Sequence, residues 1–268
     1  MRRKYHYKKA LLFLSFLVLA AMSGQGCLGF RALRGSGTIG KETREVKDFK
    51  AVELMGIGTV YIKHGEKESL RIEADDNLIS YFETDVDDGV LTISAEENVI
   101  LRPRKPVKFY LIVKELEKIE VSGSGDVRAP DLSAEQFFVG IRGSGEVKME
   151  DLTSDSLEVE ISGSGGLKLG DLDSKELKVN VSGSGDVDVA GGRVDEQDIS
   201  ISGSGKYKAR EMESARAEAR VTGSGDIEVR AQEHLKINIS GSGNVSYSGN
   251  PTVEQSVSGS GKTKRLSD

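Results

Sequence analysis

The C-terminal run Gly259-Ser-Gly-Lys-Thr263 contains the residue types of a phosphate-binding loop, in which backbone N–H groups, a lysine and a hydroxyl surround the phosphates of a nucleotide. Such a loop also needs an earlier glycine, where this chain has Ser256, and a following helix whose N-terminus binds the phosphate. Only five residues follow Thr263, which is too few for that helix. We therefore interpret the run as one copy of a repeated Gly-Ser-Gly segment.

Acidic residues follow several of these segments, and calcium-binding repeats place carboxylates between stacked turns in a similar way. The residues directly after the segments are Asp126, Glu146, Gly166, Asp186, Lys206, Asp226, Asn244 and Lys262. A stack of calcium sites needs oxygen ligands at matching places in adjacent turns, and two lysines and a glycine interrupt this column. We expect neither a metal site nor a cofactor.

The sequence also lacks the groups of neighbouring residues that hydrolysis or zinc binding requires. His64 and His234 are the only histidines beyond the N-terminal leader, and neither has another histidine or a cysteine near it in the sequence. The serines lie in repeated segments with no base beside any of them. Glu158 and Glu160 are two residues apart, which is the spacing of the solvated face of a strand. We expect no catalytic residue.

The repeated segment determines how all these residues are placed. Down the second half of the chain, Gly-Ser-Gly begins at Gly123, Gly143, Gly163, Gly183, Gly203, Gly223, Gly241 and Gly259. The first six starts are evenly spaced, and the last two intervals are slightly shorter. A fixed spacing of about 20 residues is typical of stacked repeat units, each of which contacts only its neighbours.

Apolar and polar residues alternate on both sides of each segment, with the period of a β-strand. Every residue two positions before the first glycine is valine or isoleucine, as at Val121 and Val181. Stacked copies bury these columns in one core, and strands of successive copies run parallel, so we predict an all-β fold, a parallel β-helix. Within the segment Gly123-Ser124-Gly125 the glycines permit a sharp corner, and the central serines of successive copies are expected to stack as a hydroxyl ladder.

Residues 1–26 have the composition of an export signal: five basic residues, an apolar run over 10–22 and then small residues. Cys27, the only cysteine, follows directly and is similar in position to the lipid-modified first residue of bacterial lipoproteins. The preceding residues depart from the usual lipid-attachment pattern, because Gly24 stands where a branched apolar residue is favoured. Two outcomes remain open: lipidation of Cys27, or an ordinary cut near Gly26 that leaves a free thiol.

The charge of the exported chain argues against nucleic-acid binding. The chain has a net charge of −6, and loss of the five basic residues of the leader takes it to −11, whereas a phosphate-binding surface is basic. We predict a signal peptide over 1–26, a lipidated tether over 27–48 and a β-helix over 49–268. The β-helix is expected to have irregular coils over 49–114 and regular Gly-Ser-Gly coils over 115–268.

Three sequence features together resemble one bacterial family. They are the run from Phe49 through Gly56 to Ile62, the turn Asp88-Gly89 with Leu91 and Ile93, and the Gly-Ser-Gly coils that follow. This order resembles the family described as "putative auto-transporter adhesin, head GIN domain", a cell-envelope domain of unknown function. The resemblance implies a right-handed, single-stranded parallel β-helix, often anchored as a lipoprotein, with no established activity.

We therefore expect a non-catalytic envelope lipoprotein that faces the periplasm or lies on the outer membrane, or else a secreted protein. Its partners are expected to be the membrane, through the lipid anchor, and a glycan or protein of the envelope, but no nucleic acid. The alternative is a carbohydrate-active β-helix enzyme, a polysaccharide lyase or hydrolase. An enzyme needs carboxylates and a base that converge in a cleft formed by a long loop, and residues 63–114 are the only region with room for one.

Overall fold

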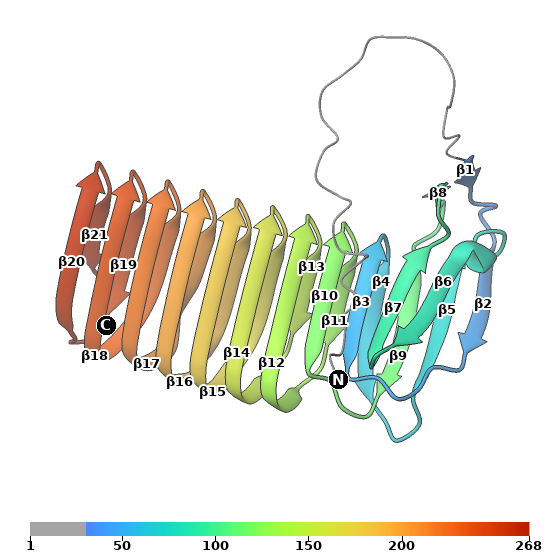
Figure 1. The fold of residues 1–268 in the computed structure, drawn as a ribbon, viewed down its shortest axis with the longest axis horizontal. Helices are drawn as coiled ribbons and strands as arrows, with labels where there is room; N and C mark the ends of the chain where they lie inside the picture. Colours follow the sequence, from blue (N-terminus) through green and yellow to red (C-terminus); the bar gives the residue numbers. More distant parts are fainter. Residues whose placement is uncertain (1–30, 268) are drawn as a thin grey trace, which may run out of the picture.

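The structure, a computed structural model, describes residues 31–267. It is a long β-solenoid in which each coil lies beside the next along one axis (Figure 1). The expected signal peptide and Cys27 lie outside the described residues. Within 31–267 no helix is long and apolar enough to cross a bilayer.

The regular coils occupy the C-terminal half. Their strands are β10 (Lys118–Gly123), β11 (Asp126–Ala129), β12 (Leu132–Gly143), β13 (Glu146–Met149), β14 (Leu152–Gly163), β15 (Gly166–Gly183), β16 (Asp186–Gly203), β17 (Lys206–Gly223), β18 (Asp226–Gly241), β19 (Asn244–Ser248), β20 (Thr252–Gly259) and β21 (Lys262–Arg265). These strands are longest in the middle coils, at 18 residues in β15, β16 and β17, and shorter at both ends.

All these strands pair in parallel with a register that follows the repeat. Val181 lies opposite Ile161 on one side and Ile201 on the other, one repeat away in each direction. The register shifts between Ala209 and Glu213, where β17 meets the shorter β18. The coils after this shift therefore have the shorter repeat seen in the sequence, and the parallel β-helix predicted from the spacing is confirmed.

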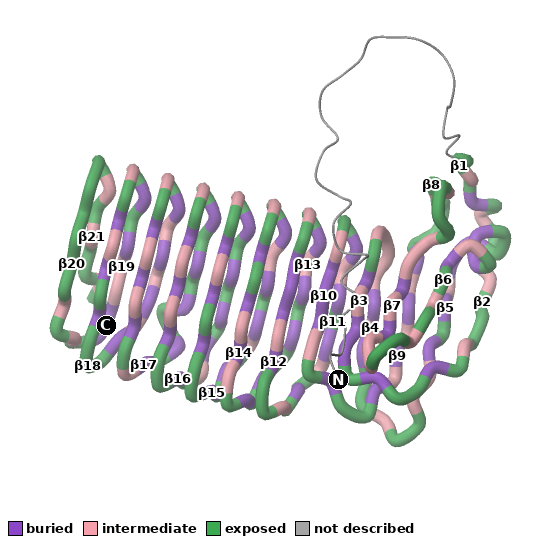
Figure 2. The backbone as a smooth tube through the Cα atoms, in the orientation of Figure 1, coloured by how far each residue is buried: buried purple, intermediate pink, exposed green. Residues whose placement is uncertain are grey.

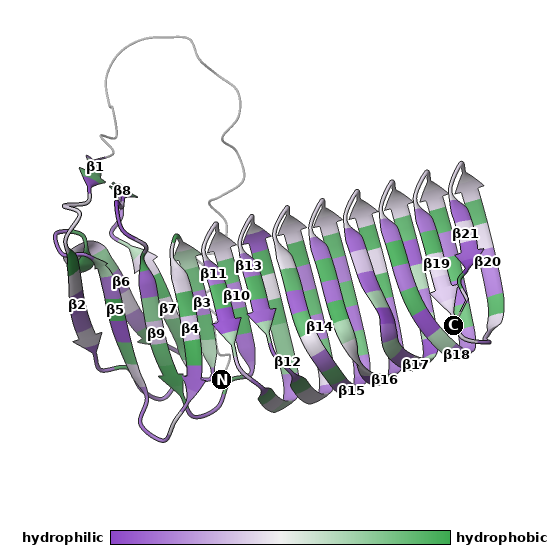
Figure 3. Ribbon diagram, turned by 180° about the vertical axis from the view of Figure 1, so that it is seen from behind, coloured by the Kyte–Doolittle hydropathy of each residue, from purple (hydrophilic) through white to green (hydrophobic). Residues whose placement is uncertain are grey.

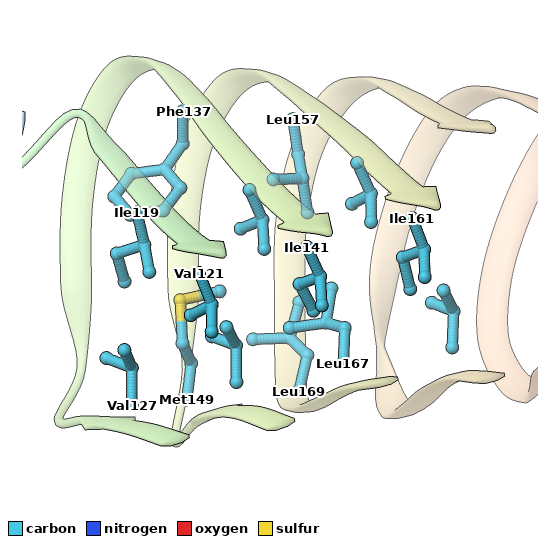
Figure 4. Close-up of a cluster of buried hydrophobic side chains, with 14 of the residues drawn as sticks. Ile119, Val121, Val127, Phe137, Ile141, Met149, Leu157, Ile161, Leu167 and Leu169 are labelled. Atoms are coloured by element: carbon cyan, nitrogen blue, oxygen red, sulfur yellow. The ribbon is translucent and has the colours of Figure 1, made fainter. Parts of the chain in front are cut away.

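The core fills the inside of the coils. Apolar and polar residues alternate along the strands of the regular coils (Figure 3). The apolar set is buried, so its side chains point inward. Ile119, Ile141 and Leu167 lie inside the flattened coils, and the same columns continue from coil to coil (Figure 4). Both Ile119 and Ile141 are fully buried. Each coil therefore completes the core of its neighbours, as expected of a repeat that cannot bury its own apolar face.

The N-terminal region has shorter and more varied strands. They are β1 (Arg31–Arg34), β2 (Ile39–Arg44), β3 (Ala51–Gly56), β4 (Thr59–His64), β5 (Ser69–Asp75), a 3-10 turn η1 (Ile79–Tyr81), β6 (Phe82–Asp87), β7 (Val90–Ala95), β8 (Val99–Arg102) and β9 (Lys108–Val113). The predicted tight turn joins β6 to β7, and both Asp88 and Gly89 have positive φ, as a two-residue hairpin requires.

Strands β3 and β4 form the first coil, and residues 65–117 separate it in sequence from the second. Strand β10 pairs with β3 on one side, while β7 pairs with β3 on the other. Strand β9 likewise pairs with β4. The antiparallel strands β6, β5 and β2 then cover this end of the parallel stack. Residues 65–117 are therefore a cap on the solenoid and not a loop beside it.

The prediction of a tether over 27–48 is wrong for its described part. Strand β1 pairs with β8, and β2 pairs with β5 over six residues. Val46 is also buried in the core. The polar, glycine-containing sequence concealed this structure, because edge strands of a cap expose most of their side chains.

Within residues 31–267, no strands cover the C-terminal end of the stack in this way. Val257 is 43% exposed, although the valines and isoleucines of its column in earlier coils are buried. The last coil is mostly exposed along its length (Figure 2). The two ends of the solenoid are therefore built differently.

Candidate functional site

The Gly-Ser-Gly corners form a straight, neutral ridge along one edge of the solenoid. Gly183 has a φ of 123°, and a Cβ on Gly185 would lie 2.6 Å from the carbonyl oxygen of Gly165, so the corner requires glycine at both places. The N–H of Ser184 donates to the carbonyl oxygen of Gly163 at 2.8 Å. In residues 31–267, successive corners are thus joined by backbone hydrogen bonds. Their central serines form an exposed row in this part of the chain, without the hydrogen bonds between hydroxyls that the expected ladder would have.

The outward strand faces carry rows of ion pairs between neighbouring coils. Lys178 Nζ lies 2.6 Å from Glu158 Oε1, and Lys168 Nζ lies 2.5 Å from Glu146 Oε2. The hydrogen bond from Lys178 to Glu158 raises the pKa of that lysine. A surface hollow of about 530 Å³ lies over coils of this face, and its lining includes the ion pair of Arg216 with Glu196. Several charges on this face are therefore neutralised by a partner on the neighbouring coil.

The residues singled out for metal and phosphate chemistry have other partners. Asp126 Oδ1 accepts the N–H of Glu146 at 3.0 Å, so this carboxylate bonds to the next coil. The N–H of Ser260 donates to Gly241 at 2.9 Å, which uses an amide that a phosphate loop would offer to its ligand. Lys262 begins strand β21 in place of a helix. The run from Gly259 to Thr263 is therefore a corner of the solenoid, as predicted.

The two histidines lie far apart in the fold. His64 ends β4, and its Nε2 is 2.9 Å from the carbonyl oxygen of Asp131. His234 lies on β18, at the edge of the hollow lined by Arg216. Among the described residues no three His, Cys, Asp or Glu side chains are placed to hold a metal ion.

Asp75 is a buried carboxylate at the N-terminal cap. Burial alone would raise its pKa, but backbone N–H groups of Lys105, Gly37 and Arg104 donate to it and lower the pKa below the usual value. A Cβ on Gly35 would lie 2.4 Å from this carboxylate. Asp75 therefore joins β5 to the segment before β2 and to the basic loop after β8, which is a structural role that the sequence did not reveal.

A second buried polar cluster lies inside the regular coils. Tyr207 donates to Gln197 at 2.9 Å, Gln197 Nε2 donates to Ser214 at 2.8 Å, and Ser214 donates to the carbonyl oxygen of Arg230 at 2.7 Å. Burial raises the pKa of Tyr207, which keeps its hydroxyl a donor. The cluster satisfies its own polar atoms and lies away from solvent, so it stabilises the coil and offers nothing to a substrate.

An apolar groove of about 240 Å³ opens at the first corner, between β3 and β8. Phe82, Ile93 and Phe109 are among the buried residues that line it, while Met55 and Ile100 lie on its exposed edges. Sequence reasoning missed this groove. The available signal was the first corner itself, where apolar side chains replace the serines of later corners.

A family model described as "Putative auto-transporter adhesin, head GIN domain" matches residues 48–251. The chain belongs to this family. The model thus covers the first coil, the cap and most of the regular coils of this head GIN domain. No curated protein matches the chain.

Solved structures share this architecture. A Parabacteroides distasonis protein described as a "putative lipid binding protein" is 27% identical with a TM-score of 0.80, over 88% of this chain and 100% of that one. A "putative adhesin" of Parabacteroides merdae is 24% identical with a TM-score of 0.81, over 88% and 99% of the two chains. Another "putative adhesin" of P. distasonis is 24% identical with a TM-score of 0.77, over 88% and 100%. The likeness to the two adhesins concerns the fold.

Proposed function

We propose that the head GIN domain is a non-catalytic binding module of the bacterial envelope, exported by residues 1–26 and tethered to a membrane through a lipid on Cys27. The family is described as an adhesin and the similar structures as adhesins or a lipid-binding protein, which supports binding over turnover. The observation that carries the proposal is the pairing of outward charges between coils. A carboxylate held by a lysine of the next coil, as Glu158 is by Lys178, is poorly placed to serve as a general acid or base.

A binding module of this form presents a rigid surface with a period of about 4.8 Å per coil. The exposed serine row and the charged strand faces offer hydroxyls and, in part, paired charges, which suit a glycan or a protein of the envelope. The alternative, a polysaccharide lyase or hydrolase, needs a catalytic cleft beside the irregular region.

A glycan array combined with a turnover assay separates the two. The protein without residues 1–26 is applied to immobilised glycans, and the same glycans are incubated with it in solution. We expect retention with no new reducing ends and no unsaturated products. Product formation that is lost on substitution within residues 63–114 would establish the enzyme instead.

The tether is tested by Cys27→Ser in the native host. We expect the substituted protein to leave the membrane fraction, while the unsubstituted protein stays in it. An unchanged distribution would remove the lipid anchor from the proposal and leave the binding module as a secreted protein.

A second candidate function, lipid binding, is favoured by the apolar groove at the first corner. The description of the 27% identical P. distasonis protein as lipid-binding points in the same direction. Both functions are compatible with one molecule, because the groove and the serine ridge are different surfaces.

A further inference from the structure

The groove exists because the first corner has no corner before it. In the regular coils the N–H of each central serine donates to the preceding corner, as Ser124 does to Gly56 at 2.9 Å. Among residues 31–267 the corner of Met55, Gly56 and Ile57 has no such neighbour, because β7 pairs with β3 only as far as Leu54. The chain then leaves β7 for β8, so one side of this corner stays open.

The open side leads into the solenoid core. Phe82 and Phe109 contact each other edge to face beside the groove, with ring centroids 5.3 Å apart, and Phe109 is fully buried. Met55 and Ile100 flank the opening, 45% and 44% exposed. A chain of methylene groups in this groove would take the place of the missing corner and continue the apolar core of the coils.

Residue types at this corner depart from those of the others. Its two outward positions carry Met55 and Ile57, whereas the corresponding positions of the next regular corner carry Ser122 and Ser124. The later corners keep serine at the centre, and serine, threonine or arginine before the first glycine. Exposed apolar side chains therefore gather where the groove opens, which is typical of a binding surface.

The strand that bounds the groove also carries cations. Arg34 lies opposite Arg102, and Ala32 lies opposite Ile100, in the parallel pair of β1 and β8. Because side chains alternate along a strand, Ile100 and Arg102 project from the same face. Both arginines are exposed, and no ion pair involves either of them in the described part of the chain. Residues 31–34 and 99–105 together hold five basic residues and no carboxylate, in a chain of net charge −6.

We propose that this groove binds an acyl chain of an anionic phospholipid in a membrane leaflet, with Arg34 and Arg102 contacting its headgroup. The inference rests on the second candidate function above and adds the site and the class of lipid. Apolar surface beside unpaired cations complements such a lipid in both chemistry and charge. Cys27 precedes Arg31 by four residues, a reach of at most about 14 Å, so this end of the solenoid lies close to the membrane when the cysteine is anchored.

The experiment uses the chain from residue 27 onward with Cys27→Ser, which retains all described residues. Its binding is measured by co-sedimentation with vesicles of phosphatidylcholine alone and of phosphatidylcholine with one third phosphatidylglycerol. We expect binding to the anionic vesicles only. Arg34→Gln with Arg102→Gln should weaken it roughly 30-fold, since each cation near the surface contributes about a fivefold gain. Met55→Ser with Ile100→Asn should weaken it about tenfold or more.

Matched controls lie at the other end of the solenoid, where Lys262→Gln with Lys264→Gln removes the same charge and Val257→Ser removes a similarly exposed apolar side chain. These variants should bind like the parent, and urea unfolding checks that every variant folds. If the parent binds and the groove variants bind equally well, lipid binding stands and the site is wrong. If the parent binds neither vesicle, the lipid function fails as well. A concentration-dependent dimer that Ile100→Asn abolishes, without vesicle binding, would assign the groove to a second copy.

Discussion

The regular coils and the N-terminal region place their side chains according to different rules. Within the regular coils an inward residue such as Val181 packs against its equivalents in both neighbours, and several outward charges pair with charges of the next coil. In the N-terminal region the strands change direction, a carboxylate is buried at Asp75, and exposed arginines lie beside an open apolar groove.

This difference shows where a repeat protein can acquire a specific site. A uniform coil offers the same surface many times, which suits weak and extended contacts. A site with a unique shape needs a place where the repeat is broken, and here that place is the first corner with its cap. The following substitutions test the comparison by making related changes in both regions.

The largest effect is expected for Val181→Asp, because Val181 is buried between Ile161 and Ile201. An unpaired carboxylate in this column should lower the free energy of unfolding by about 3 to 5 kcal/mol. The same change at Val257, which is 43% exposed in the last coil, should have little effect. Urea unfolding measures both, and equal effects would contradict the inward placement of the column.

Replacing the first glycine of a corner by alanine should have different effects at the first corner and at the regular corners. Gly183 has positive φ, and a Cβ there would lie 2.5 Å from Gly163 O. Gly56 also has positive φ, but a Cβ would meet nothing within 4 Å. Gly56→Ala should lower the free energy of unfolding by about 1 to 2 kcal/mol, because of backbone strain alone. Gly183→Ala should lower it by about 1 to 3 kcal/mol more, because the methyl group would overlap the preceding coil. Equal urea midpoints would show that the first corner is not open.

Asp75→Asn tests the cap. An amide cannot accept hydrogen bonds at both of its polar atoms, so the contacts to Gly37 and to Arg104 and Lys105 cannot all survive. We therefore expect the free energy of unfolding to fall by about 2 kcal/mol. The pKa of Asp75 is lowered in the folded state, so its contribution is present above the ordinary value of 3.8 and is lost as the pH falls through the folded pKa below it.

The difference in stability between parent and Asp75→Asn should accordingly shrink as the pH is lowered below about 4. Asp186→Asn in the regular coils is the control, because Asp186 accepts only one backbone N–H, from Lys206, and is exposed. Thermal unfolding between pH 3 and pH 7 provides the measurement. A constant difference over this range would mean that the charge of Asp75 does not stabilise the cap.

The same contrast explains what could be predicted from the sequence. The regular coils can be predicted from the sequence because one pattern recurs. This pattern, the column of Val121 and Val181 together with the corner glycines, indicates the strand period, the register and the core. The Gly-Ser-Gly at Gly35 shows the limit of the motif, because it wraps around Asp75 and does not form a corner of the stack.

The cap and the groove were missed because they depend on contacts between segments far apart in the chain. Strand β1 pairs with β8 across more than sixty residues, and no periodicity marks either of them. The replacement of corner serines by Met55 and Ile57 was visible, but it carries meaning only when the missing neighbour of that corner is known. Cys27 and the export signal precede residue 31 and stay predictions.

The smallest effect is expected for the exposed ion pairs of the regular coils. Glu158→Gln removes the partner of Lys178, and because water and salt screen both groups, the urea midpoint should stay unchanged. Glu120→Gln is the contrasting change, since the Glu120 side chain is 11% exposed where the first regular coil meets the N-terminal one, and it pairs with Lys118 and Arg142. Loss of these two ion pairs should lower the free energy of unfolding by about 1 kcal/mol. If neither change moves the midpoint, the ion pairs neutralise the surface without stabilising it. If Glu158→Gln is the more costly, the regular coils depend on their outer faces as well as on their core.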